Sequence, residues 1–118
     1  QSQLETMMKS MEEMIQAAQQ AAETIQKQMN ETQGKLDSLE VEGLSGGGLV
    51  RIRCSAKGRV IAVSIDDSLI QPSEKQILED LVAAAYNDAR VKADSVAGEE
   101  MAKAQQGMGL PPGFKLPF

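Results

Sequence analysis

Four basic side chains gathered in one short stretch are the residues of this sequence best suited to chemistry. Residues 51–65 hold no acidic residue and four basic ones, Arg51, Arg53, Lys57 and Arg59, for a local net charge of +4. Such a cluster binds phosphates and speeds the approach of a polyanion. The whole chain nevertheless carries a net charge of −5. The cluster can therefore also be interpreted as solvated charge that balances an acidic chain, and both interpretations stay open.

The residues that enzymes use most are scarce. The chain has no histidine, the usual general base near neutral pH. Its single cysteine, Cys54, lies on the apolar side of a strand-like alternation, which predicts a packed, unreactive thiol. The glycine run 46–48 lacks the Lys-Ser/Thr that completes a phosphate loop, and we expect a turn there. We expect no enzyme, no catalytic residue, no metal site, no cofactor and no small-molecule substrate.

Length and composition predict the number of domains and the cellular compartment. The 118 residues suit one domain, but aromatic residues make up only 3%, so we expect a second chain to complete a thin core. One cysteine forms no internal disulfide, and no apolar run is long enough to cross a membrane. No secretory signal is visible. We expect a cytoplasmic protein without a membrane partner, whose natural N-terminus lies upstream of Gln1 because the chain lacks an initial Met.

The first element is expected to be a long helix over residues 2–37. Apolar or small residues recur in steps of four and three from Leu4 to Leu39, which is an unbroken heptad stripe without a proline. A stripe this long must pack on another helix, in this chain or in a second copy; the alternative is a helix lying on its own core. The methionines of the stripe favour ordinary core or dimer packing, or else an adaptable groove for a partner helix.

A strand region over residues 38–65 follows. Alternation from Leu49 to Ser55 puts Arg51 and Arg53 on one face, opposite three apolar residues. Residues 56–58 read as a hairpin turn, and Arg59 to Ile65 is apolar on both faces. A strand apolar on both faces is expected in the middle of a sheet or under a helix. Together these segments predict a three-stranded antiparallel meander.

A second long helix is expected over residues 73–106. Ser73 is a plausible N-cap with Gln76 three residues on, and Gly107 stops the helix. Residues 107–118 contain three prolines, which predicts an extended, proline-rich tail; it also holds both phenylalanines, so we expect a functional tail. The chain is thus expected to be an α+β protein with a single domain over 1–106 and a tail over 107–118.

Four segments together resemble one known family, the YbaB/EbfC nucleoid-associated proteins of bacteria. They are Gly-Leu-Ser-Gly-Gly-Gly-Leu-Val at 43–50, Ile-Asp-Asp-Ser-Leu at 65–69, Leu-Glu-Asp-Leu-Val-Ala-Ala-Ala-Tyr-Asn-Asp-Ala at 78–89 and Gly-Leu-Pro-Pro-Gly-Phe-Lys-Leu-Pro-Phe at 109–118. The resemblance implies a tweezer-like homodimer in which a sheet core carries long helices. It also implies a cytoplasmic, nucleoid-associated protein that binds double-stranded DNA with little sequence preference.

These expectations assign residues to two surfaces. The first helix is acidic here, whereas family members often carry more lysine there, so we place the DNA contacts on the hairpin: Arg51, Arg53, Lys57 and Arg59, with Lys9 of the first helix as a further candidate. The dimer interface is expected at Met8, Met11, Ile15, Ile25, Val63 and Leu81. The predicted function is DNA binding that influences nucleoid organisation or gene expression. The alternative is a non-enzymatic adaptor that binds proteins through the Met-rich helix or the tail.

Overall fold

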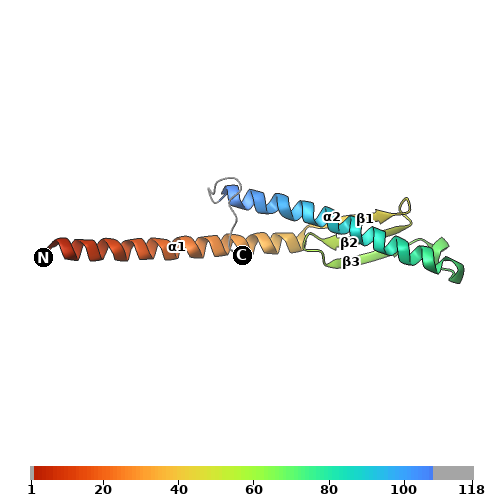
Figure 1. Ribbon diagram of the computed structural model, residues 1–118, viewed down its shortest axis with the longest axis horizontal. Helices are drawn as coiled ribbons and strands as arrows, with labels where there is room; N and C mark the ends of the chain where they lie inside the picture. The colour runs from red at the N-terminus through yellow and green to blue at the C-terminus, as the bar shows by residue number, and fades with distance from the viewer. Residues whose placement is uncertain (1, 108–118) are drawn as a thin grey trace. The chain divides into compact units, whose positions relative to one another are not determined.

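The fold consists of a long helix, a three-stranded sheet and a second long helix (Figure 1). The computed structural model describes residues 2–107. Its elements are α1 (Ser2–Ser38), β1 (Glu40–Ser45), β2 (Val50–Ser55), β3 (Val60–Ile65), two 3₁₀ turns (Asp67–Leu69 and Pro72–Glu74) and α2 (Lys75–Gly107). This confirms the predicted α+β fold class. The chain divides after residue 31 into two parts, each described here by itself. The expected tail beyond Gly107 lies outside the described residues.

In residues 2–31, α1 is helical throughout, as its heptad pattern predicts. Its apolar stripe is exposed along the N-terminal half. The large side chains that keep more than half of their surface in solvent there are Leu4, Met7, Met8, Met11, Met14 and Ile15. Farther along, Ile25 is half-buried and Met29 is buried. The N-terminal half of this helix is therefore an amphipathic surface whose apolar side is uncovered.

The last turn of α1 belongs to the part that contains the sheet. Leu36 is 4% exposed there, so the end of the stripe is covered within the chain. The helix ends where the Ser38 hydroxyl and the Leu39 N–H both donate to the Lys35 carbonyl. The Lys35 ammonium lies 2.8 Å from the Glu100 carboxylate and so joins this turn to α2.

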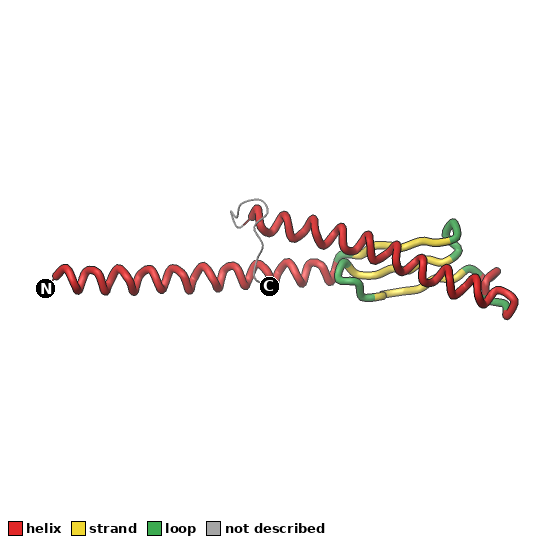
Figure 2. The backbone as a smooth tube through the Cα atoms, in the orientation of Figure 1, coloured by secondary structure: helices red, strands yellow, loops and turns green. Residues whose placement is uncertain are grey.

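The three strands form an antiparallel sheet in the order β1-β2-β3 (Figure 2). β1 and β2 are joined by a turn in which Gly46, Gly47 and Gly48 all have positive φ, a conformation that glycine adopts without steric cost. Between β2 and β3 the register shifts at Arg53/Cys54, which makes a bulge. The predicted meander, with turns at both glycine-containing segments, is confirmed.

One face of β1 and β2 is covered by α2 (Figure 1). Ala85, Ala89 and Ala93 form a fully buried row on the helix, and their small side chains allow close approach to the sheet. Gly43 of β1 lies against this row: a Cβ there would overlap backbone atoms of α2 and lie 2.6 Å from the Cβ of Ala89. The core between the layers holds chiefly Val50, Ile52, Cys54 and Leu69.

The prediction that residues 59–65 lie in the middle of the sheet or under a helix is wrong. β3 is an edge strand, and five of its six residues are exposed. The reason is geometric: α2 packs on β1 and β2, and one helix is too narrow to cover β3 as well. The apolar pattern of the strand was recognised correctly, but nothing in residues 2–107 covers it.

The second helix begins slightly later than predicted. Residues 72–74 form a separate 3₁₀ turn with Gln71 as its N-terminal cap residue, and Ser73 lies inside that turn instead of capping α2. Pro72 favours this arrangement because its fixed φ suits the first position of a helical turn. The helix then runs to Gly107, close to the expected end.

Candidate nucleic-acid interface

Strand β2 presents Arg51 and Arg53 on the sheet face that α2 leaves open. Val50, Ile52 and Cys54 point the other way and are at most 2% exposed, so the alternation fixes the direction of the two arginines. About half of each arginine side chain is exposed, 55% for Arg51 and 51% for Arg53. The prediction that these two cations share an outer face is confirmed.

Acidic side chains accompany these cations. The Arg53 Nε lies 2.8 Å from the Glu40 carboxylate, and an Arg51 Nη lies 3.8 Å from that of Glu42. Both glutamates come from β1, whose antiparallel register places Glu42 directly opposite Arg53. The spacing of Glu40 and Glu42, two residues apart, puts both glutamates on the same face of β1. Their pairing with the arginines can be predicted from this spacing only once the register of the hairpin is known. The open face therefore carries pairs of opposite charges and is not a purely basic patch.

The tip of the β2–β3 hairpin is held in place by α2. The Tyr86 hydroxyl donates to the Gly58 carbonyl at 3.5 Å, and Arg90 donates to the Lys57 carbonyl at 3.3 Å. Within the turn, the buried Ser55 hydroxyl accepts the amides of Lys57 and Arg59. The Lys57 ammonium lies 3.6 Å from the Asp37 carboxylate. The hairpin tip thus presents its cations from a fixed backbone.

The remaining two predicted DNA contacts differ from these three. Arg59 is exposed and takes part in no ion pair within residues 2–107. Lys9 is an exposed residue of α1 in the other part of the chain, also without an ion pair among the described residues. The structure thus gathers Arg51, Arg53 and Lys57 beside acids.

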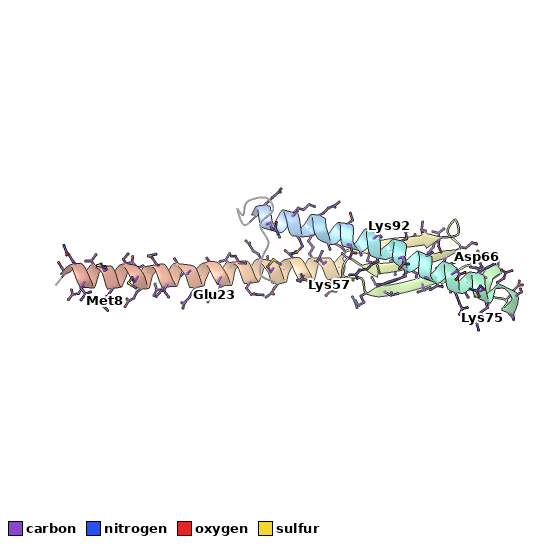
Figure 3. All side chains as sticks on the ribbon, in the orientation of Figure 1. Met8, Glu23, Lys57, Asp66, Lys75 and Lys92 are labelled. Atoms are coloured by element: carbon purple, nitrogen blue, oxygen red, sulfur yellow. The ribbon has the colours of Figure 1, made fainter. Side chains whose placement is uncertain are left out.

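The predicted dimer residues lie in several environments. Met8, Met11 and Ile15 are 55–60% exposed on α1, where Met8 is labelled in Figure 3. Val63 of β3 is 50% exposed. Leu81 of α2 is half-buried and packs within the chain against the core that contains Val50 and Ile52. The large uncovered apolar side chains among the candidates are therefore those of α1 and β3.

Residues 2–107 give little support for a reactive thiol, a metal site or a membrane-spanning helix. Cys54 is fully buried, and burial raises the pKa of its thiol against the opposing influence of Arg90. No three histidine, cysteine or acidic side chains in this range are placed to hold a metal ion. No helix of this range is both long and apolar enough to cross a bilayer.

The helix–meander–helix topology makes this chain a small α+β protein. The model of the YbaB/EbfC DNA-binding family matches residues 1–108, so the chain belongs to that family. The resemblance found in the sequence is thereby confirmed.

Relatives and a solved structure agree with this assignment. The chain is 50% identical over 97 residues to a nucleoid-associated protein of Methylocella silvestris and 53% identical to one of Rhodopseudomonas palustris. Each match covers 82% of this chain and 91% of the relative. An uncharacterised Helicobacter pylori protein of known structure matches with a TM-score of 0.58 at 22% identity, covering 74% of this chain and 87% of that one. That likeness concerns the fold.

Proposed function

We propose that this protein is a homodimer that binds duplex DNA in the bacterial nucleoid, within the cytoplasm, with little preference for sequence. The observation that carries the proposal is family membership over residues 1–108, together with relatives at about 50% identity that are named nucleoid-associated proteins. Binding of this kind acts on nucleoid organisation or gene expression. It needs no catalytic group, in keeping with a family described by DNA binding.

The proposed DNA contacts are Arg51 and Arg53, exposed on the open face of β2, and Lys57, exposed at the tip of the β2–β3 hairpin. Their present partners are carboxylates that are themselves about half exposed, and exposed ion pairs contribute only about 0–1 kcal/mol each. DNA phosphates therefore replace these carboxylates at little cost. Contacts with phosphates carry no base information, which explains the expected lack of sequence preference.

The neighbouring acids set the strength of the complex. Glu40 and Glu42 give the open face as many negative as positive charges. A phosphate that approaches an arginine therefore also meets a carboxylate, so binding is weak and depends strongly on salt. Three contacts per subunit give six per dimer, for which the logarithm of the binding constant falls with that of the salt concentration at a slope of about −5.

Two double variants with opposite expected effects on DNA affinity test this surface by fluorescence anisotropy with a labelled duplex. Arg51→Gln with Arg53→Gln should weaken binding about tenfold or more to every duplex alike, and should flatten the salt slope by about 3.6, because four of the six contacts of the dimer are removed. Glu40→Gln with Glu42→Gln should tighten binding, because it removes repulsion and leaves the arginines in place.

The matched control is Lys75→Gln with Lys103→Gln, which removes two exposed cations from α2 and should change binding much less. Equal losses in the arginine pair and in this control would show that only net charge matters. A loss confined to Lys9→Gln would place the contact on α1 instead.

A second candidate function, an adaptor for protein partners, is favoured by the six large apolar side chains exposed on α1 between residues 4 and 15. Docking of an apolar helix is insensitive to salt, whereas phosphate binding is not. Met8→Glu with Met11→Glu would abolish an adaptor complex while leaving the contacts of the sheet with DNA intact.

A further inference from the structure

The first four turns of α1 hold most of the methionines of the chain. Four of the seven, Met7, Met8, Met11 and Met14, fall within eight residues. Their exposed fractions are 62%, 55%, 60% and 68%, so their side chains lie largely uncovered among residues 2–107. Figure 3 shows Met8 in this stretch, near the N-terminal end of the helix. Each side chain carries a thioether sulfur, which the proposed DNA binding does not use.

Three of these methionines are neighbours on the surface of the helix. Helix α1 is continuous through this stretch, and helical side chains three or four positions apart lie next to each other, with about 5–6 Å between their Cβ atoms. Met11 comes four residues after Met7 and three after Met8. Long helical side chains lean toward the N-terminus, which directs Met11 toward the other two. Met14 is about 10 Å along the axis from Met7 and lies outside this triangle.

The spacing of this triangle suits the convergence of three sulfurs on one ion. Methionine is unbranched and has three rotatable bonds, so its sulfur is free to move around the position that Cβ fixes. Cβ atoms about 5–6 Å apart therefore leave room for the three sulfurs to meet at one point above the helix. All three side chains are exposed, so an ion reaches them from solvent without breaking packing among residues 2–107.

The chemistry of the ligands selects the ion. A thioether is a soft, uncharged ligand that favours Cu(I), whereas carboxylate and carbonyl oxygens suit Mg²⁺ and Ca²⁺. Nearby, three acids, Glu5, Glu12 and Glu13, outnumber one base, Lys9, so residues 4–14 have a net charge of −2. This charge attracts cations. The acids form no site of their own, because no three histidine, cysteine or acidic side chains in the described part of the chain are placed to hold a metal ion.

We propose that Met7, Met8 and Met11 form a binding site for one soft monovalent cation, Cu(I) or its analogue Ag(I), through their three thioether sulfurs. The inference is independent of the proposed DNA contacts, which belong to the sheet and its hairpin. Met8 and Met11 are also candidate dimer residues, and packing against another helix needs only their apolar surface. Replacement by leucine keeps an apolar side chain of similar size and removes the sulfur, so it separates metal binding from packing.

Isothermal titration of the full chain with silver nitrate in a chloride-free buffer tests the site. Ag(I) is the probe because it is a soft monovalent cation like Cu(I) and needs no reductant. We expect one Ag(I) to bind per chain. Met7→Leu, Met8→Leu and Met11→Leu should each weaken binding about tenfold or more, because each removes one of three ligands, and the triple variant should not bind. Leucine is as good a helix former as methionine, so the variants keep α1 helical.

Three controls separate this site from other ligands of the chain. Met14→Leu makes the same substitution at an exposed position of the same helix and should change the affinity less than about twofold, since Met14 lies outside the triangle. Thiols also bind soft cations, but Cys54 is buried, so Cys54→Ala should bind Ag(I) as the parent does. Mg²⁺ in large excess should not displace Ag(I), because Mg²⁺ competes only for carboxylates such as Glu12 and Glu13.

Nuclear magnetic resonance of the protein with ¹³C-labelled methionine methyl groups locates the ion. Ag(I) should shift the signals of the three ligand methionines, which the single leucine variants assign. The signals of Met29, which is buried, and of Met101 on α2 should not move.

The proposal is overturned if the triple leucine variant, made together with Cys54→Ala, binds Ag(I) as the parent does. Displacement of Ag(I) by Mg²⁺, a shift confined to other methionines, or an equal loss of affinity in Met14→Leu would also overturn it. The triple variant should bind DNA as the parent does in the absence of Ag(I), so failure of this site leaves the proposed function standing.

Discussion

Replacing Gly43 with alanine tests the packing of β1 against α2. The added Cβ would overlap the Ala85 carbonyl oxygen and the Ala89 amide nitrogen, and would lie 2.6 Å from the Ala89 Cβ. Two of these three atoms belong to the helix backbone, so no side-chain rotation relieves the overlap. The helix must move away from the sheet and loosen the core around Cys54 and Ala93.

Overpacking that side chains can absorb costs about 1–3 kcal/mol, so a shift of the whole helix should cost about 3 kcal/mol or more. For a chain of 118 residues this lowers the melting temperature by roughly 10 °C or more. Urea unfolding followed by circular dichroism, at one protein concentration, measures the loss. Gly98→Ala is the matched control, because nothing lies within 4 Å of a Cβ there and α2 gains a better helix former. Equal unfolding midpoints for Gly43→Ala and the parent would refute the packing described above.

Three further predictions concern α2 and its contacts. Asp88→Ala with Lys92→Ala should free the outward Leu44 N–H and Glu42 carbonyl at the β1 edge and give larger species than the parent by light scattering, whereas Asp94→Ala on the same helix should not. A double variant of the same size as the parent would contradict the protection of this edge by the two side chains. The Leu44 N–H and, to a smaller extent, Lys92 stabilise the charged Asp88 carboxylate and hold its pKa below the ordinary 3.8. The contribution of this carboxylate to stability is therefore complete above pH 3.8 and is lost as the pH falls through the lower, folded pKa. The midpoint of urea unfolding should lose that acid dependence in Asp88→Asn but keep it in Asp94→Asn. Cys54 should react with a thiol reagent only at the rate of unfolding, because it is fully buried and burial raises its pKa; rapid reaction of the folded protein would be inconsistent with its place in the core.

Patterns with a local period were predictable from the sequence. The heptad stripe predicted α1, and the alternation through Arg51 and Arg53 predicted both β2 and the face that these arginines occupy. Helix α2 followed from its alanine-rich stripe, although Pro72 delayed its start. In each case the signal lies within one element, where side-chain spacing translates directly into direction.

Features that depend on packing between distant segments were not predictable in this way. The pattern of β3 revealed two apolar faces, but not that α2 stops short of them. The ion pairs of Arg51 and Arg53 with β1 depend on hairpin register, and the contacts of Asp88 and Lys92 with β1 join residues 44 and 50 positions apart. Such contacts change the electrostatic environment of a charged side chain: most cations of the basic cluster are paired with carboxylates in the fold.

The measurement that tests the central claim most directly is the affinity of the unmodified protein for a labelled duplex as a function of salt. We expect binding at 50 mM salt that weakens about a thousandfold by 200 mM, as six phosphate contacts require, with two duplexes of unrelated sequence giving the same curve. No binding at 50 mM salt, or an affinity that does not change between the two concentrations, would contradict a DNA-binding role for this sheet.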